Sequence, residues 1–345
     1  MRKSFHMVHK LTHGQEGALR RGAFLFFLFL LMCLPACAAQ KEDSAVHRAP
    51  VRQTDNVRLA PEWQDLRARL AADGLAGPEV DALLTSLGPR TESPMGRKMV
   101  ELYKKNFLPR PPSKKPARDA VYKGVVTTAN ARLCRDYIRE HEKAFETAHK
   151  RYGVPPSVAC ALLFVETRLG RYLGDVQENA LQTLASMAES RTLASIPSWY
   201  GRMPGFEAHE AWFAQIMPRR ADWAYRETRA LVRYMLDNDI RPDMLPGSIY
   251  GAIGLCQFMP SNIRPYGMDG NGDGVINLYV ADDAVASLAN YLARHGWKAT
   301  SSKSARHRVL MRYNKSTVYA NTILALADRI DRLGGKPART AAGSR

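Results

Sequence analysis

Leucines recur at helical spacing in the N-terminal part of the chain. Between Trp63 and Leu87 they predict two short helices, separated near Gly74–Pro78 where glycine and proline interrupt the pattern. Residues 108–116 follow with four prolines and two lysines, and we expect them to be extended because proline fixes φ and has no N–H. We therefore place a small N-terminal helical region at residues 61–116.

After this break the hydrophobic pattern is mainly that of helices. The charged, amphipathic stretch 132–152 predicts one helical segment, and the prolines within 154–157 end it and start another. Residues 222–237 are also helical in pattern, and apolar side chains recur at every fourth position across 280–295. A last helix is expected over residues 316–333. Because we find no strand-rich region and no internal repeat, the chain predicts a mainly α fold.

The N-terminus has the pattern of an export signal. A basic stretch precedes an apolar run from Ala23 to Leu34, which is shorter than the roughly 20 residues that span a bilayer. The run leads into Leu34-Pro35-Ala36-Cys37, which resembles a bacterial lipobox. We therefore expect residues 1–37 to be a lipoprotein signal peptide, with Cys37 lipidated. Plain cleavage near this small-residue site is the alternative, and both readings predict export.

Polar segments lie on both sides of the part that is expected to fold. Residues 38–60 are polar and irregular, so we expect a tether, and residues 336–345 are expected to be a disordered tail. Alanine rather than aspartate follows Cys37. In a Gram-negative host this favours the periplasmic face of the outer membrane, whereas a chain without the lipid would be soluble in the periplasm.

The composition adds a strong positive charge. The 345 residues include 50 Lys and Arg against 33 Asp and Glu, a formal net charge of +17, which suits an acidic partner. Nucleic acid, anionic lipid and the acidic bacterial wall are alternatives, and the export signal argues against nucleic acid. Cys134, Cys160 and Cys256 are the cysteines beyond the N-terminal region, and they allow one disulfide without identifying it.

Residues 160–170 (CALLFVETRLG) place an acidic side chain on an apolar helix face. Glu166 lies four residues after Leu162, and none of its neighbours three or four positions away is cationic. A buried carboxyl without a cationic neighbour should have a raised pKa, as a general acid at neutral pH requires. The alternative is a core glutamate that pairs with an arginine from elsewhere, such as Arg219 or Arg220.

Two further segments carry groups that suit a sugar. In residues 247–263 (GSIYGAIGLCQFMPSNI) the glycines allow close approach of the backbone to another surface, and Gln257 offers both a donor and an acceptor. This mixture suits the floor of a sugar cleft, and a merely tight loop is the alternative. Residues 312–319 (RYNKSTVY) supply aromatic and amide groups in Tyr313, Asn314 and Tyr319. Tyr313 is equally a candidate for the core.

Residues 269–274 (DGNGDG) resemble the start of an EF-hand calcium loop. Oxygen side chains stand at positions one, three and five, glycine stands at position six, and Val275 would add a backbone carbonyl. The usual glutamate at position twelve is replaced by Val280, so Asp282 or Asp283 would have to close the site. The alternative is a turn rich in Asp and Asn that holds no metal.

Together these segments resemble the MltB-type membrane-bound lytic murein transglycosylases, in the same order, from about residue 60 to 333. The resemblance implies a lysozyme-like catalytic domain at residues 117–335, with Glu166 as its sole acid/base. It also implies that further residues line a glycan cleft, namely Ser248, Gln257, Tyr291, Tyr313, Asn314 and Tyr319. A structural Ca²⁺ would be held by Asp269, Asn271, Asp273, the carbonyl of Val275 and Asp283.

Members of this family cleave the β-1,4 bond between MurNAc and GlcNAc in peptidoglycan. The resemblance implies that Glu166 protonates the bridging oxygen and then deprotonates the MurNAc C6 hydroxyl, which closes a 1,6-anhydro ring. A hydrolytic muramidase would instead need a second carboxylate, and a non-catalytic wall-binding lipoprotein would need no buried acid. The expected partners are glycan strands and, through the lipid, a membrane; nucleic acid is not expected, and the oligomeric state is open.

Two features depart from the family pattern. Residues 188–217 look like an insertion that could form a lid or extra sugar subsites, since it carries Trp199, Tyr200, Trp212 and Phe213. The span between Trp297 and Arg312 is short, whereas family members can carry a long additional segment there. The details of the sugar subsites, and any preference for the peptide stems, are therefore left open.

Overall fold

The computed structural model describes residues 59–109, 116–174, 176 and 178–334, and helices dominate these ranges. In the same ranges extended pairing is limited to isolated bridges, such as Gly247 with Ile253. The expectation of a mainly α fold is confirmed. The α-helices are α1 (Gln64–Ala72), α2 (Pro78–Thr85), α3 (Ser93–Phe107), α4 (Thr128–Glu140), α5 (Glu142–Tyr152), α6 (Pro156–Thr167), α7 (Ala180–Ala188), α8 (Glu210–Asp237), α9 (Ile263–Tyr266), α10 (Ala281–Arg294), α11 (Lys303–Tyr313) and α12 (Thr317–Gly334).

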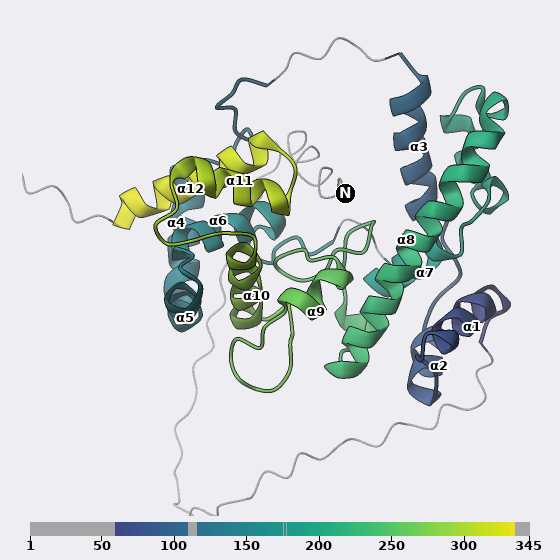
Figure 1. Ribbon diagram of the computed structural model, residues 1–345, viewed down its shortest axis with the longest axis horizontal. Helices are drawn as coiled ribbons and strands as arrows, with labels where there is room; N and C mark the ends of the chain where they lie inside the picture. Colours follow the sequence, from purple (N-terminus) through teal and green to yellow (C-terminus); the bar gives the residue numbers. More distant parts are fainter. Residues whose placement is uncertain (1–58, 110–115, 175, 177, 335–345) are drawn as a thin grey trace, which may run out of the picture.

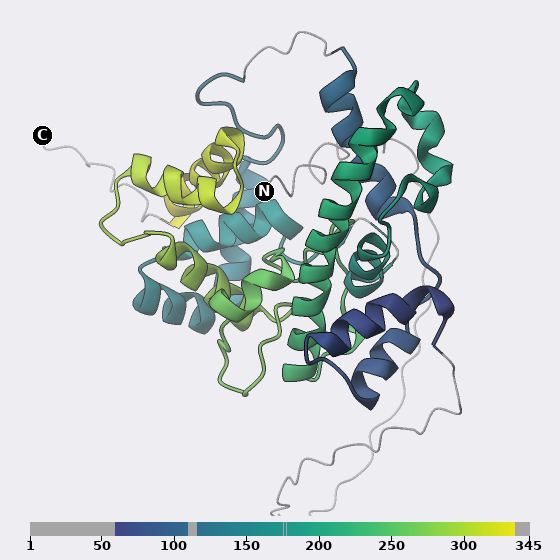
Figure 2. The same ribbon diagram turned by 45° about the vertical axis from the view of Figure 1, so that its right-hand side comes forward.

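The helices form two groups that lie side by side (Figures 1 and 2). In one group α12 packs along α6 and α4, and α10 packs against α5. In the other, α7 runs against the long α8, and α2 and α3 pack on α8, with α3 also on α7. Figure 1 shows α9 and the loops around it between the two groups. One continuous cluster of buried apolar side chains extends through both groups.

Capping side chains, and in one case a proline, explain where several helices begin. The Thr127 hydroxyl accepts a hydrogen bond from the N–H of Asn130 at the start of α4. Asn179 and Ser302 cap α7 and α11 in the same way. Pro156 is the first residue of α6, where the N–H that proline lacks would have no partner within the helix.

The observed helices follow the predicted pattern with two differences. The two short N-terminal helices and the helices expected over 280–295 and 316–333 are present as α1, α2, α10 and α12. The stretch 132–152 is divided between α4 and α5 at His141, whose φ of −113° and ψ of 33° end the first helix, so the prediction of one segment is wrong. α8 begins twelve residues before position 222, and Pro218 lies inside it.

Segment 188–217, which we expected to be an insertion, packs against α3. Its first part forms three short 3₁₀ turns, and its last part is the start of α8. The ring of Trp199 lies directly on Gly96, where a Cβ atom would come within 2.3 Å of the indole. The Tyr103 hydroxyl donates to the carbonyl of Pro204 at 2.6 Å, and its ring stacks on Phe213. Part of the aromatic content of the segment therefore attaches it to α3, and a role as a lid or subsite remains a prediction.

Several predictions concern parts of the chain that the structure does not describe. The signal peptide, Cys37, most of the tether and the tail lie outside the described residues. Within them, no helix is long and apolar enough to cross a membrane. The three cysteines beyond the N-terminal region are all buried and free. The domain boundary near residue 116 stays a prediction.

Candidate active site

The candidate acid/base lies at the end of a deeply buried helix. Ten of the 12 residues of α6 are buried, because the helix is apolar on nearly all sides and packs between α4 and α12. Glu166 lies in its last turn and is only 7% exposed. The helix ends at Thr167, and Arg168 and Leu169 follow it with positive φ of 52° and 60° although neither is glycine.

Glu166 contacts a phenol and no cationic side chain that the structure describes. Tyr319 Oη donates a hydrogen bond of 2.5 Å to Glu166 Oε1, across 153 positions of sequence. None of the ion pairs in the described ranges includes Glu166, so pairing with Arg219 or Arg220 is not observed. The carboxyl is therefore buried and accepts a hydrogen bond from an uncharged donor.

This environment raises the pKa of Glu166 to about 7. The cause is removal of the carboxyl from water, which disfavours its charged form, and the hydrogen bond from Tyr319 lowers the pKa in part. No other acidic group contributes to this shift. A carboxyl with a pKa near 7 can both give and take a proton at neutral pH, as one group must do if it serves first as acid and then as base.

Tyrosines form a continuous wall beside Glu166. The rings of Tyr319 and Tyr313 lie nearly parallel with centroids 6.5 Å apart, and Tyr313 meets Tyr291 edge to face at 4.9 Å. The Tyr313 hydroxyl donates to the carbonyl of Cys256, and the Tyr291 hydroxyl donates to the carbonyl of Arg312 at 3.1 Å. These contacts fix the wall, so the tyrosine hydroxyls are already used within the protein.

The amide side chains of Asn314 and Gln257 differ in their partners. Asn314 is 6% exposed, and its Nδ2 has no hydrogen-bond partner among the described residues. A buried amide without a partner is costly, which is typical of a group that awaits a ligand. Gln257 Nε2 donates to the carbonyls of Leu173 and Gly254, and its backbone has a φ of 50°. Strain of this kind is often found at functional sites.

The glycine-rich loop is held against the catalytic helix. Thr167 Oγ1 donates to the carbonyl of Leu255 at 2.9 Å, which joins the residue after Glu166 to this loop. Gly254 has a φ of 73°, and a Cβ atom there would come within 2.6 Å of the carbonyl oxygen of Leu278. Ser248 lies in the same loop, but its Oγ accepts the N–H groups of Tyr250 and Ala252. The loop is therefore tight as well as adjacent to Glu166.

Tyr122 lies near Glu166, and no pattern in the sequence indicates it. Burial raises the pKa of its phenol, a hydrogen bond with Ser316 lowers it, and the charge of Glu166 raises it. Its backbone N–H donates to Thr322 Oγ1 at 2.8 Å, which attaches this segment to α12. Tyr122 follows the proline-rich break and belongs to no periodic pattern. Only its position before a predicted helical domain could have suggested a role.

The predicted calcium loop carries the right kinds of donors but uses them internally. Asp269 accepts the N–H groups of Gly272 and Gly274, and Asp283 accepts those of Gly270 and Asn277. Burial raises the pKa of Asp283. In the described ranges no three His, Cys, Asp or Glu side chains lie close enough together to hold a metal. The donors fit Ca²⁺ in chemistry, but their present arrangement equally fits a turn without metal.

Comparison with known proteins identifies the family. Membrane-bound lytic murein transglycosylase B of Escherichia coli is 34% identical over 158 residues, which span 46% of this chain and only 36% of that relative. The fold is similar to that of the Escherichia coli lytic transglycosylase Slt35 in complex with calcium, with a TM-score of 0.57, 22% identity, and coverage of 79% of this chain and 93% of that one.

A third similarity is to SltB3 of Pseudomonas aeruginosa in complex with NAG-NAM-pentapeptide, with a TM-score of 0.58, 20% identity, and coverage of 80% of this chain and 79% of that one. These structures confirm the expected lysozyme-like fold of lytic transglycosylases. A family model described as the transglycosylase SLT domain matches residues 58–306, well over half of the 345-residue chain. The chain therefore belongs to the lytic transglycosylase family of this domain.

Proposed function

We propose that this protein is a lytic transglycosylase that cleaves the β-1,4 bond between MurNAc and GlcNAc in peptidoglycan and leaves a 1,6-anhydroMurNAc end. The observation that carries the proposal is Glu166, a buried carboxyl with a pKa of about 7 beside a single uncharged donor. Membership of the family and the named activities of its relatives support the choice of substrate.

In the proposed reaction Glu166 acts twice. It first protonates the oxygen that bridges MurNAc and GlcNAc, while positive charge develops at the anomeric carbon of MurNAc. As a carboxylate it then removes the proton from the MurNAc C6 hydroxyl, whose oxygen attacks the anomeric carbon and closes the anhydro ring. The hydrogen bond from Tyr319 keeps the carboxyl in one orientation through both proton transfers.

The surroundings of Glu166 favour this reaction over hydrolysis. Glycosidases that use water work with a pair of carboxyl groups flanking the scissile bond. Among the described residues no second acidic side chain shifts the pKa of Glu166, and its contact is a phenol. An intramolecular hydroxyl needs only the one acid/base, so the single carboxyl matches the anhydro product.

The decisive experiment digests purified peptidoglycan with the mature protein and analyses the released sugars by mass spectrometry. We expect products ending in 1,6-anhydroMurNAc. We expect Glu166→Gln to lower the rate of their formation by roughly 10²–10⁴-fold while the protein stays folded. Products with reducing ends would mean that water attacks. If wild-type protein that is folded releases no sugar, the protein is a binding or scaffold protein instead.

We also propose that residues 269–283 bind a structural Ca²⁺. The donors named above and the calcium complex of a relative with this fold support the proposal. Calcium would lie apart from the chemistry at Glu166 and would join the loop to the start of α10, since Asp283 belongs to that helix. A chelator should then lower the melting temperature, and added Ca²⁺ should restore it. An unchanged melting temperature would exclude a bound ion.

For localisation we propose a lipid anchor at Cys37 that holds the protein to the periplasmic face of the outer membrane. The lipobox-like Leu34-Pro35-Ala36-Cys37 supports it, as does the membrane-bound relative. Cys37→Ala should move the protein from the membrane fraction to the soluble periplasmic fraction. If wild type and Cys37→Ala divide in the same way between the membrane and soluble fractions, Cys37 carries no anchor.

A further inference from the structure

Glu227 is a buried acidic side chain that the proposed sugar cleavage does not use. It lies on α8 and is 5% exposed. Its Oε2 accepts a hydrogen bond from the N–H of Ser261, and its Oε1 accepts one from the Ser261 hydroxyl, both at 3.0 Å. No ion pair in the part of the chain that the structure describes includes Glu227. Because a buried carboxyl without hydrogen bonds is costly, the two donors of Ser261 are what compensates for its burial.

Ser261 belongs to the segment that carries Gln257, the amide that we expect to line the glycan cleft. Four positions separate the two residues, and no glycine lies between them. Ser261 stands in a short 3₁₀ turn, Pro260–Asn262, which packs on α8. Pro260 fixes its own φ angle. The backbone between Gln257 and Ser261 therefore has little freedom once Ser261 is held.

The other end of the same segment is fixed to the group of helices that contains Glu166. Thr167, the residue after Glu166, donates to the carbonyl of Leu255 at 2.9 Å. The Tyr313 hydroxyl donates to the carbonyl of the next residue, Cys256. Thr167 ends α6 and Tyr313 ends α11, so these bonds place the segment relative to the acid.

Phe258 connects the segment to the tyrosine wall. Its ring is 1% exposed, and its centroid lies 5.7 Å from that of Tyr291 and 6.0 Å from that of Tyr313. Tyr313 in turn lies nearly parallel to Tyr319, which donates to Glu166. A shift of this segment would therefore pass through direct ring contacts to the wall beside the carboxyl.

Gln257 needs support on both sides because its backbone is strained. Its φ is 50° although it is not glycine, and such a conformation persists only where the surrounding structure holds it. Its Nε2 donates to the carbonyls of Leu173 and Gly254, which orients the side chain. The bonds from Ser261 to Glu227 hold the chain beyond Gln257. They come from α8, in the second group of helices, so the place of Gln257 depends on both groups.

We propose that Glu227 is a positioning residue for the transglycosylase reaction, which holds Gln257 and the tyrosine wall in place through Ser261. The inference rests on the proposed function, since the reaction at Glu166 is what requires this arrangement. Glu227 acts through its two hydrogen bonds and transfers no proton. A glutamine at this position can keep both bonds, because its oxygen accepts the N–H and its nitrogen donates to the hydroxyl oxygen. An alanine loses both.

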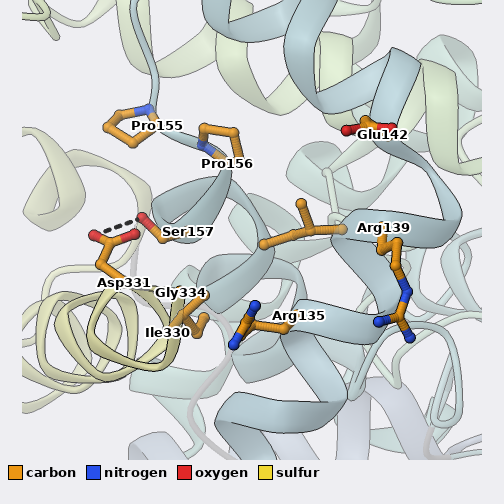
Figure 3. A pocket seen from close by; sticks show the side chains of 10 residues that line it. Arg135, Arg139, Glu142, Pro155, Pro156, Ser157, Ile330, Asp331 and Gly334 are labelled. Atoms are coloured by element: carbon orange, nitrogen blue, oxygen red, sulfur yellow. Dashed lines mark hydrogen bonds between the residues drawn. The ribbon is translucent and has the colours of Figure 1, made fainter. Parts of the chain in front are cut away.

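A second serine–carboxylate bond between two elements offers a matched control (Figure 3). The Ser157 hydroxyl donates to Asp331 Oδ2 at 3.1 Å, and Ser157 is 3% exposed. This bond joins the first turn of α6 to α12. Glu166 lies nine positions further along α6, or about 14 Å at 1.5 Å per residue. Asp331→Ala should therefore remove a comparable bond without moving the groups around Glu166.

The first test measures kcat and KM on soluble glycan strands for Glu227→Ala, Glu227→Gln and Asp331→Ala. We expect Glu227→Ala to lower kcat about tenfold and to change KM less than about twofold, because misplaced groups cost more in the transition state than in binding. Glu227→Gln should keep kcat within about threefold of wild type, since it keeps both bonds. Asp331→Ala should keep the wild-type kcat, although melting curves should show both alanine variants to be less stable.

A second measurement does not depend on activity. The N–H of Ser261 is bonded to Glu227, so its hydrogen exchange should become about tenfold faster in Glu227→Ala. Mass spectrometry of peptides that cover residues 257–263 measures this rate, which should stay slow in Glu227→Gln and Asp331→Ala. If Glu227→Ala does not fold, Ser261→Ala takes its place. It keeps the N–H bond and loses the hydroxyl bond, and should lower kcat about threefold.

Other outcomes overturn the inference in distinguishable ways. An unchanged kcat in Glu227→Ala, or an equal fall in Asp331→Ala, would show that Glu227 does not position the site. An equal fall in Glu227→Gln and Glu227→Ala would show that Glu227 acts through its charge, as a second catalytic acid would. If exchange at Ser261 changes as expected but the wild-type protein releases no sugar, the contact stands, and the proposed function fails together with the role in the reaction.

Discussion

At the scale of single residues, the chemistry of Glu166 follows from what surrounds it. Its neighbours on α6 are apolar, and that much can be predicted from their spacing in the sequence. Its hydrogen-bond partner cannot be predicted from spacing, because Tyr319 lies 153 positions away on another helix. The packing of α12 on α6 brings the two together. The family motif, rather than any local pattern, is what pointed to Tyr319.

Ionisation of Glu166 should destabilise the fold in a defined pH range. A rise of the folded pKa from an ordinary 4.5 to about 7 corresponds to about 3 kcal/mol. The contribution of protonated Glu166 to the free energy of unfolding is fully present below pH 4.5. It is lost as the pH rises to about 7, because over this range the unfolded protein has released the proton that the folded protein still holds. Glu166→Gln cannot ionise, so it should gain up to about 3 kcal/mol over wild type by pH 8.

Urea unfolding of both proteins at pH 4, 6 and 8 measures this difference. At pH 4 the two should be similar in stability, and the gap should widen as the pH increases. A constant gap across the range would mean that the pKa of Glu166 is the same in the folded and the unfolded protein, and would contradict its proposed role as acid at neutral pH.

Loss of the Tyr319 hydroxyl should move the pH profile of the reaction. The hydrogen bond lowers the pKa of Glu166, so Tyr319→Phe should raise this pKa and shift the alkaline limb of kcat/KM to higher pH. We also expect kcat to fall about tenfold, since the carboxyl loses its fixed orientation. The control is Tyr225→Phe, which removes a phenol–carboxylate bond to Asp73 far from Glu166. If both variants keep the wild-type profile, Tyr319 has no part in setting the pKa.

At the scale of elements, the loop between α8 and α9 depends on glycine for close approach. Gly254→Ala places a Cβ atom against the backbone carbonyl of Leu278, which cannot move aside, and keeps an unfavourable φ of 73°. Gly124 has a similar φ of 75°, but nothing lies near its missing Cβ. We expect Gly124→Ala to cost about 1–2 kcal/mol and Gly254→Ala about 2–5 kcal/mol. Equal losses in urea unfolding would show that the contact with Leu278 is easily relieved.

The ends of helices could be predicted from the sequence only where glycine or proline marks them. Gly74, Pro78 and Pro156 mark helix ends that the structure reproduces, because proline fixes φ and glycine readily adopts the positive φ that follows a helix. His141 is neither glycine nor proline, so the division between α4 and α5 that its backbone angles create could not be predicted from the residue type. The start of α8 before position 222 could not be predicted from the sequence either. One side of this helix is buried by its contacts with α3 and α7, which come from other parts of the chain.

At the scale of the whole molecule, positive charge should govern how the protein reaches its substrate. The formal net charge of +17 includes exposed arginines on several helices. Such charges attract an anionic wall over about 10 Å at 0.1 M salt and about 3 Å at 1 M salt. We therefore expect binding to purified peptidoglycan to weaken steeply with added NaCl, measured by co-sedimentation of the inactive Glu166→Gln protein. Binding that is independent of salt would assign the interaction to contacts with the sugar alone.

The distance in sequence between Glu166 and Tyr319 has a consequence under the export that we propose above. A chain that leaves the cytoplasm from its N-terminus onwards delivers α6 well before α12. Because α12 packs on α6 and burial raises the pKa of Glu166, we expect this carboxyl to have an ordinary pKa, and to be ionised at neutral pH, in a chain that lacks α12. Under the proposed function, we therefore expect a chain that ends before Thr317 to lack transglycosylase activity, because it lacks α12 and Tyr319.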